Sequence, residues 1–232
     1  MNGLTPIEQR PESLTEQVFT KIQDSIVDGT LAPGSRVSEA SVAELLGVSK
    51  TPVRESLVRL RVIGLVESTG TGRFRIVAPS AQAVQDAYEV RSLLETEAAR
   101  MAAGRISSTD ARRLADFAQD TTIMAGAGTL NGFRDTDRRF HLAVAAATDN
   151  AVLSSRVEQA YVLSAALTGR SALAAPVMSR CAEDHVQIAQ MIGDMDGEGA
   201  ATAMATHLGA LLETALGEVA EDPAEKQERI SR

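Results

Sequence analysis

The sequence predicts a mainly α-helical protein with two domains: a small N-terminal domain that ends in a strand hairpin, and an all-α C-terminal bundle of six or seven helices. Two observations predict this fold class. Residues 36–77 contain two short amphipathic segments, a glycine turn and two β-type segments. Residues 81–217 are rich in alanine and leucine, and short polar turns divide them into pieces of helical length. The chain has 232 residues, which suits two domains of ordinary size.

The segment 36–77 has the pattern of a winged helix-turn-helix. Ser38 is placed to cap a first helix, Gly47 supplies the turn, and Ser49 is placed to cap a second helix. The wing follows as a hairpin over residues 67–77. In this motif the second helix enters the major groove of double-stranded DNA. The side chains that we expect to face the core are Ala43, Leu45, Leu46, Val53, Leu57, Leu60 and Ile63.

Charge supports a DNA contact through this segment alone. The whole chain has a net charge of −8, which by itself disfavours nucleic acid as a partner. Residues 36–75, however, contain seven basic and four acidic side chains, whereas the residues after 80 contain 14 basic and 22 acidic ones. Docking through the basic segment predicts binding that weakens steeply with salt. The predicted DNA-contacting residues are Arg36, Ser49, Lys50, Thr51, Arg54 and Gly70.

These residues resemble the GntR family of bacterial transcription regulators. The family pattern is a Pro-Gly turn, a short helix, a Gly-Val-Ser-Arg-Thr-Pro-Val-Arg-Glu segment and a Gly-Leu-Val strand. Lys50 stands where arginine is usual, and lysine is a point charge without the fork that pairs with a guanine edge. The matching residues here are Pro33, Gly34, Ala43, Leu46, Gly47, Val48, Ser49, Thr51, Pro52, Val53, Arg54, Glu55, Leu57, Leu60, Gly64, Leu65 and Val66.

The sequence outside the motif sets the expected domain boundaries. We expect a flexible arm over residues 1–13, the DNA-binding domain over 14–77, a linker over 78–80, the helical domain over 81–220 and a flexible tail over 221–232. Cys181 is the single cysteine, so no intramolecular disulfide can form. Because no apolar run reaches the roughly 18 residues of a membrane span, we expect a cytoplasmic protein without a membrane contact.

All three histidines of the chain fall in the predicted bundle. Asp137 and His141 are four residues apart, so they project from the same face of one helix. His185 and His207 lie at similar distances from the polar turn between them, so an antiparallel hairpin would bring their rings level. Three imidazoles and one carboxylate suit a divalent transition metal such as zinc, nickel, manganese or iron. Cys181, four residues before His185, is interpreted as a small buried apolar side chain.

The second half resembles the FCD domain, the all-helical effector module of the FadR branch of the GntR family. The resemblance rests on Asp137, His141, the turn after them, His185 and His207. It implies a metal bound by these four residues, a small carboxylate effector that completes its coordination and changes DNA affinity, and a homodimer on a palindromic operator. The sequence leaves open whether such a regulator is a repressor or an activator.

Two questions stay open at this stage. Arg91 either faces an effector carboxylate or forms an exposed salt bridge with Glu95 four residues later. Arg138, Arg139 and Arg170 are weaker candidates for the effector role. The alternative function is a metal-dependent hydrolase fused to a DNA-binding head. It is the weaker interpretation because no acidic residue other than Asp137 has a spacing that nominates it as a general base.

Overall fold

The computed structural model describes residues 13–168 and 174–221, and the weaker effector candidate Arg170 lies outside these residues. The chain divides into two compact units, residues 1–78 and 79–232.

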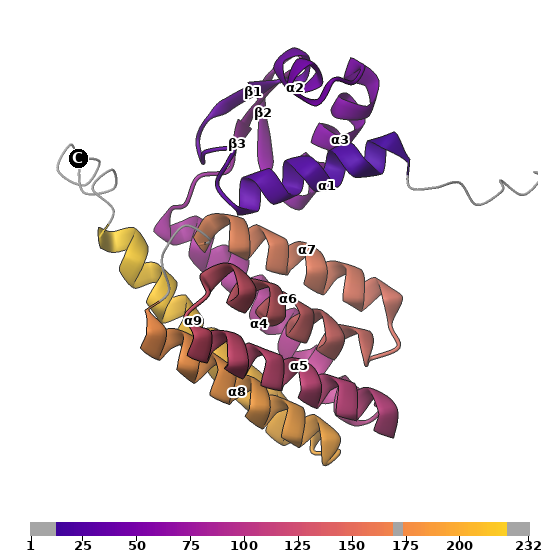
Figure 1. The fold of residues 1–232 in the computed structure, drawn as a ribbon, viewed down its shortest axis with the longest axis vertical. Helices are drawn as coiled ribbons and strands as arrows, with labels where there is room; N and C mark the ends of the chain where they lie inside the picture. Colours follow the sequence, from indigo (N-terminus) through magenta and orange to yellow (C-terminus); the bar gives the residue numbers. More distant parts are fainter. Residues whose placement is uncertain (1–12, 169–173, 222–232) are drawn as a thin grey trace, which may run out of the picture. The chain divides into compact units, whose positions relative to one another are not determined.

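From residue 13 onward, the N-terminal unit holds three helices and a small antiparallel sheet (Figure 1). The sheet has the strand order β1-β3-β2. β2 and β3 form the predicted wing hairpin, and β1 pairs with the outer edge of β3, so that Val37 lies opposite Phe74. The elements are α1 (Leu14–Val27), β1 (Arg36–Ser38), α2 (Glu39–Leu46), α3 (Lys50–Ile63), β2 (Val66–Gly70) and β3 (Arg73–Ile76).

Local chemistry explains where the two helices of the motif begin and end. The Ser38 hydroxyl accepts from the backbone N–H of Ser41 at 3.1 Å and caps α2, as predicted. Gly47 ends α2 at a φ of +64°, a left-handed conformation that glycine adopts without strain. Val53 and Leu57 of α3 are completely buried and fix this helix against the rest of the unit.

Three local expectations for this unit need correction. Leu45 was expected in the core but is 81% exposed, because it lies about 200° around the short helix α2 from the buried Ala43. Ser49 occupies the N-cap position of α3, but its side chain makes no capping hydrogen bond. The third strand, β1, was not predicted, since three residues are too few to show an alternating pattern.

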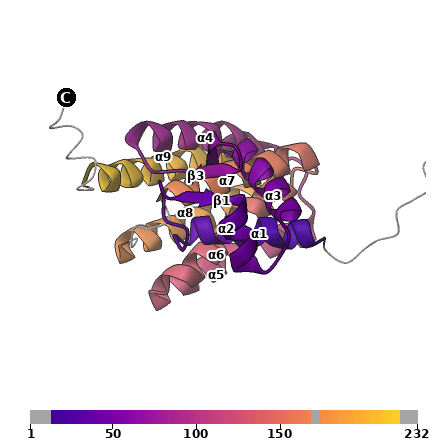
Figure 2. The ribbon, with the colours of Figure 1, turned by 90° about the horizontal axis from the view of Figure 1, so that it is seen from above.

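The C-terminal unit contains six helices among the described residues, which resolves the prediction of six or seven for that part of the chain. α4 packs along α9 and α7, and α5 packs along α8 and α6. Figure 2 shows α4 and α9 side by side from above. The mainly α fold class is confirmed. The helices are α4 (Ala81–Ala103), α5 (Ser108–Ala127), α6 (Leu130–Ala146), α7 (Ala151–Thr168), α8 (Ala175–Gly193) and α9 (Gly197–Glu221).

The core of the helical unit lies where α4, α6, α8 and α9 meet. Phe140, Ile188 and Met204 are completely buried in it. Each of these side chains lies within three residues of a histidine on the same helix. The packing that buries them therefore also positions the polar groups described below. Within the described residues, no helix combines the length and the apolar character that crossing a membrane requires.

Candidate metal centre and nucleic-acid interface

The four predicted metal ligands converge in the interior of the helical unit. Asp137 and His141 come from α6, His185 from α8 and His207 from α9, and one ligand atom of each lies within 4.8 Å of the others. The rings of His185 and His207 have centroids 4.9 Å apart, so α8 and α9 do bring the two imidazoles level. All three imidazoles are at most 1% exposed.

The spacing of the donor atoms fits one cation. His207 Nε2 lies 3.4 Å from His141 Nε2, and Asp137 Oδ1 lies 3.5 Å from His185 Nε2 and 3.8 Å from His141 Nε2. Metal–nitrogen bonds of about 2.0–2.1 Å place neighbouring ligands about 3.0–3.4 Å apart. These three separations are therefore only slightly wider than a bound ion requires, and all four donor atoms lie within 4.8 Å of one another.

Two carboxylates lie on the outer side of the histidine rings. Glu95 Oε2 is 2.5 Å from His141 Nδ1, and Asp184 Oδ2 is 3.2 Å from His207 Nδ1. An imidazole that donates from Nδ1 presents a lone pair at Nε2. The Nε2 atoms of His141 and His207 then face each other at 3.4 Å with two lone pairs, an arrangement that a cation between them stabilises. The residues present therefore fit a divalent metal.

Burial keeps two of the rings in the form that binds metals. It lowers the pKa of His185 well below the usual 6.5, and the neighbouring imidazoles lower it further. Burial also lowers the pKa of His207, although the hydrogen bond to Asp184 opposes this shift. His185 stacks on Phe140 with centroids 4.0 Å apart, and its Nδ1 has no hydrogen-bond partner among the described residues.

Asp137 is held by two further side chains. The Tyr161 hydroxyl donates to Oδ2 at 2.6 Å, and the Cys181 thiol lies 3.4 Å from Oδ1. Burial raises the pKa of the Cys181 thiol well above its usual value, and the Asp137 carboxylate adds to that effect. Cys181 is therefore a neutral hydrogen-bond donor, buried as its apolar character suggested.

The structure corrects one of the two expectations for Arg91, and its contact with an effector stays a prediction. Arg91 pairs with Glu95, but the pair is not an exposed salt bridge: it is buried, with side chains only 4% and 2% exposed. Arg91 Nε donates to Glu95 Oε1 at 2.6 Å, and Nη1 donates to the Ser164 hydroxyl at 3.2 Å. Burial would raise the pKa of Glu95, but the Arg91 guanidinium and His141 overcome it and hold that pKa at about 2. Glu95 thus joins Arg91 to a metal-ligand candidate.

The weaker arginine candidates lie away from this cluster's interior. Arg138 pairs with Glu158 at 3.0 Å, and Arg139 is half exposed. The sequence did not predict that Glu95, Asp184 and Tyr161 contact the candidate metal ligands. Of these, only Glu95 carried a signal, its spacing of four from Arg91, and that signal did not indicate burial.

On the N-terminal unit, the predicted DNA-contacting residues of α3 are exposed. Lys50, Thr51 and Arg54 all lie on the open side of the helix. The Arg54 side chain is 65% exposed, and Nε and Nη2 donate to the Glu39 carboxylate at 2.9–3.0 Å. This two-point contact with Glu39 on α2 orients the Arg54 guanidinium. The edge of the guanidinium that points away from Glu39 stays exposed.

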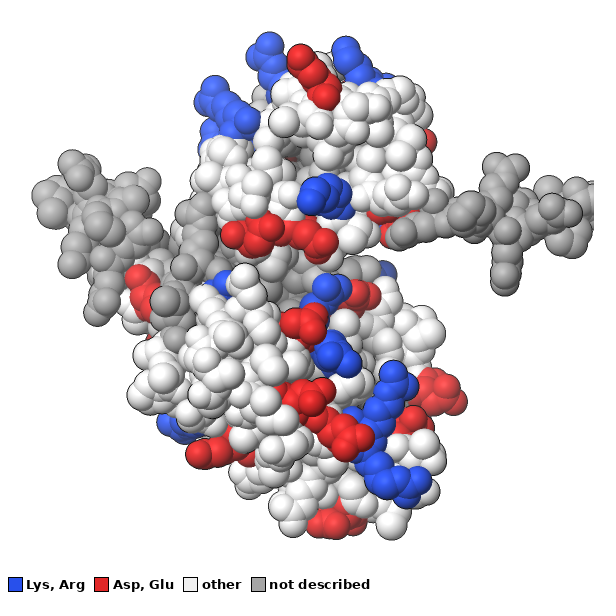
Figure 3. All heavy atoms as spheres, viewed as in Figure 1, with Lys and Arg blue, Asp and Glu red and all other residues white. Residues whose placement is uncertain are grey.

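The other three predicted contacts lie around the same helix and sheet. Arg36 in β1 pairs across the sheet with Arg75 in β3, which places two cations side by side. Gly70 ends β2 at a φ of +150° and Ser49 precedes α3 with an exposed side chain. On the face shown in Figure 3, several blue side chains and a red one project from the outer margin of the N-terminal unit, and red and blue side chains are mixed over the helical unit.

The fold and these sites define a DNA-binding regulator: a winged helix-turn-helix unit and a helical unit with a buried cluster of histidines. The chain belongs to the GntR family and carries an FCD domain. Residues 14–76 match the family described as "Bacterial regulatory proteins, gntR family", and residues 86–210 match the FCD domain.

Individual relatives agree with this assignment. The transcriptional regulator LutR of Bacillus subtilis is 30% identical over 79% of this chain and 92% of its own length. The putative L-lactate dehydrogenase operon regulatory protein of Escherichia coli is 29% identical over 96% of this chain and 93% of its own. For two further regulators, the matched region covers 59% and 64% of the relative.

The regulator McbR of Escherichia coli is similar in sequence and in structure. It is 27% identical over 65% of this chain and 68% of its own length. Its solved structure superimposes with a TM-score of 0.79 at 22% identity, covering 90% of this chain and 99% of that one, which shows a shared fold. Since the relatives and both domains are those of transcription regulators, the protein is a regulator and not an enzyme. The alternative of a hydrolase is not supported.

Proposed function

We propose that the protein is a metabolite-responsive transcription regulator whose helical domain holds a divalent transition metal through Asp137, His141, His185 and His207. A small carboxylate effector binds at this metal and changes the affinity of the winged helix-turn-helix domain for DNA. The metal supplies a Lewis-acidic position for a carboxylate oxygen. The observation that carries the proposal is the facing pair of Nε2 atoms, 3.4 Å apart, in rings whose Nδ1 atoms meet carboxylates.

Arg91 is the residue that we assign to the effector. Its three hydrogen bonds to Glu95 and Ser164 leave one further N–H on each terminal nitrogen. The guanidinium also lies over the Tyr161 ring, 4.8 Å from the centroid, and Tyr161 holds Asp137. A carboxylate that bridges the metal and these two N–H groups would thus bind to a guanidinium that is already fixed.

For the DNA-binding unit we propose a homodimer on a palindromic operator. Two copies of α3 then enter successive major grooves, with Lys50, Thr51 and Arg54 at the groove and the wing residue Gly70 beside it. Effector control requires that the carboxylate bind one arrangement of the dimer more tightly than another, because equal affinity for both shifts nothing.

A matched pair of variants on α6 tests the metal site. Asp137→Asn removes a ligand oxygen, whereas Asp135→Asn makes the same change two residues away at a side chain that is 70% exposed. We expect D137N, His185→Ala and His207→Ala each to lower the bound metal measured by mass spectrometry after dialysis, and D135N to keep wild-type stoichiometry. Full stoichiometry in all three ligand variants would refute the assigned ligands.

A thermal-shift screen tests the effector. Small carboxylates are added to the metal-loaded protein and to chelator-treated protein, and we expect a larger rise in melting temperature in the metal-loaded form. The active carboxylate should also change operator affinity in a gel-shift titration of the metal-loaded protein. Equal thermal shifts in both forms would separate the effector from the metal.

A further inference from the structure

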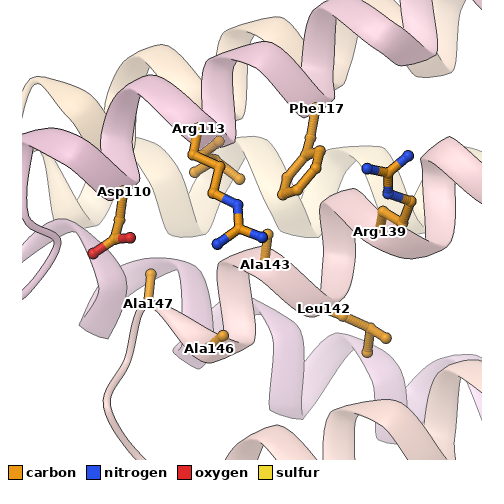
Figure 4. A pocket seen from close by; sticks show the side chains of 9 residues that line it. Asp110, Arg113, Phe117, Arg139, Leu142, Ala143, Ala146 and Ala147 are labelled. Atoms are coloured by element: carbon orange, nitrogen blue, oxygen red, sulfur yellow. The ribbon is translucent and has the colours of Figure 1, made fainter.

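A groove of about 470 Å³ lies between α5 and α6, outside the histidine cluster (Figure 4). α6 turns His141 inward, whereas its next residues Leu142 and Ala143 line the groove. Leu114 and Phe117 of α5 supply the apolar wall opposite them. The volume falls in the range of about 300–1,000 Å³ that small-molecule sites occupy. One side of α6 therefore carries metal-ligand candidates and another side lines a separate groove.

Two guanidinium groups face this groove from different helices. The Cζ atoms of Arg113 and Arg139 lie 5.5 and 4.9 Å from the centroid of the Phe117 ring, and Figure 4 shows them on either side of that ring. Such contacts hold an arginine near the aromatic face and leave its N–H groups free to bind an anion. The cations are thus placed at an apolar wall, not scattered over open surface.

The acidic side chains near the groove compensate its two cations unequally. Arg113 forms no ion pair with any residue in the described part of the chain, and the exposed Asp135 approaches Arg139 only to 3.8 Å. Asp110 is the single acidic residue among the lining side chains, and its carboxylate accepts from the Ser107 hydroxyl at 2.6 Å. Among the described residues, Arg113 therefore keeps a positive charge that no ion pair offsets, which favours an occupant with one negative charge.

We propose that this groove binds an organic monoanion with a flat apolar body, such as an aromatic carboxylate. The ring packs on Leu114, Leu142 and Phe117, and the carboxylate lies between Arg113 and Arg139. Both halves of such a ligand are needed for binding. Phosphate offers no apolar body to the groove wall, and a neutral aromatic amide offers no charge to the arginines. The site is distinct from the effector site assigned above, and it does not depend on a bound metal.

Three probes separate these contributions. 2-Naphthoate is titrated into the chelator-treated, full-length protein and followed by its own fluorescence, which is clear because the chain contains no tryptophan. We expect saturable binding of 2-naphthoate, at least tenfold weaker binding of 2-naphthamide, and no competition by inorganic phosphate at equal concentration. Equal affinity for the acid and the amide, or displacement by phosphate, would overturn the proposal.

Matched variants locate the binding. In the double variant Arg113→Gln/Arg139→Gln, both changes fall on exposed side chains, and the far-ultraviolet spectrum and the melting temperature verify that it folds. We expect it to bind 2-naphthoate at least tenfold more weakly than the wild-type protein. The control Arg112→Gln removes an exposed cation from the same helix and should bind as the wild type does. If R112Q and the double variant lose affinity equally, the ligand responds to overall charge and the groove is not its site.

Discussion

At the scale of single residues, Glu95 connects the groups on which the sensor proposal depends. Its carboxylate pairs with Arg91 on one side and meets His141 Nδ1 at 2.5 Å on the other. Its pKa of about 2 keeps it ionised in spite of burial, so a negative charge lies against the outer nitrogen of His141. In the proposed sensor, Glu95 is therefore a positioning residue for His141 and for Arg91.

Replacing Glu95 with glutamine should weaken metal binding by about 10- to 100-fold, the usual effect of removing a carboxylate behind a ligating histidine. Competition with a chromophoric chelator measures this change. Glu97→Gln is the control, because Glu97 is on the same helix but is 55% exposed and pairs with Arg100 at the surface. Wild-type metal affinity in a folded E95Q variant would remove Glu95 from this role.

Arg54 is the corresponding residue of the DNA-binding unit. Arg54→Ala should weaken operator binding by roughly 10- to 100-fold, since a single arginine contact with a base contributes about 1–3 kcal/mol. A gel-shift titration measures the change. The melting temperature should fall slightly, because the variant leaves the Glu39 carboxylate, which is only 11% exposed, without its Arg54 partner. Arg61→Ala, at the far end of the same helix, is the matched control. A loss of equal size in both variants would contradict a specific contact at Arg54.

At the scale of elements, the sequence predicted what periodicity and spacing encode. The described part of the C-terminal unit is a series of helices, as its alanine- and leucine-rich segments predicted, and the α8–α9 hairpin brings His185 and His207 together as their spacing indicated. Leu45 was misplaced because one apolar side chain on an eight-residue helix does not fix which face is buried. Short elements carry too few residues for a period to be read.

The side chains that contact the candidate metal ligands from behind could not be predicted, for a different reason. Asp184 contacts His207 from another helix, and Tyr161 reaches Asp137 across 24 positions of sequence. These contacts depend on how α7, α8 and α9 pack against α6, which no local pattern records. Arg91 shows the same limit: its spacing predicted Glu95 as a partner, but packing decides that the pair is buried.

The turn between α8 and α9 offers a test at this scale. Met195 has a φ of +61°, a left-handed conformation that disfavours any residue with a Cβ, and its side chain is 75% exposed. Met195→Gly should raise the stability of the helical unit by about 0.5–1 kcal/mol, or the melting temperature by roughly 1–3 °C in calorimetry. Met195→Ala keeps the Cβ and should give no such rise. An equal rise in both variants would show that the side chain, and not the backbone, is responsible.

At the scale of the whole molecule, DNA binding has to act against the net charge of the chain. The total is −8, and the acidic surplus falls after residue 80, while residues 36–75 are basic. A duplex therefore meets attraction at the winged helix-turn-helix unit and general repulsion from the rest of the chain, and both effects decrease with salt. The local contacts release counterions from the DNA, so we expect them to dominate the salt dependence.

The slope of log K against log[salt] can also show how many subunits contact the DNA. Each phosphate contact contributes about 0.9 to this slope on duplex DNA. Lys50 is exposed at the first position of α3, so Lys50→Ala should lower the slope by about 1.8 if two subunits each lose one contact, and by about 0.9 if one subunit binds.

Fluorescence anisotropy with a labelled operator between about 50 and 200 mM salt measures this slope. Arg112→Ala makes the same change of charge in the helical unit and should leave the slope unchanged. An unaltered slope in K50A would remove Lys50 from the phosphate interface. A change near 0.9 would support the contact but contradict the proposed homodimer on the operator. In a symmetric dimer, one substitution removes two equivalent contacts.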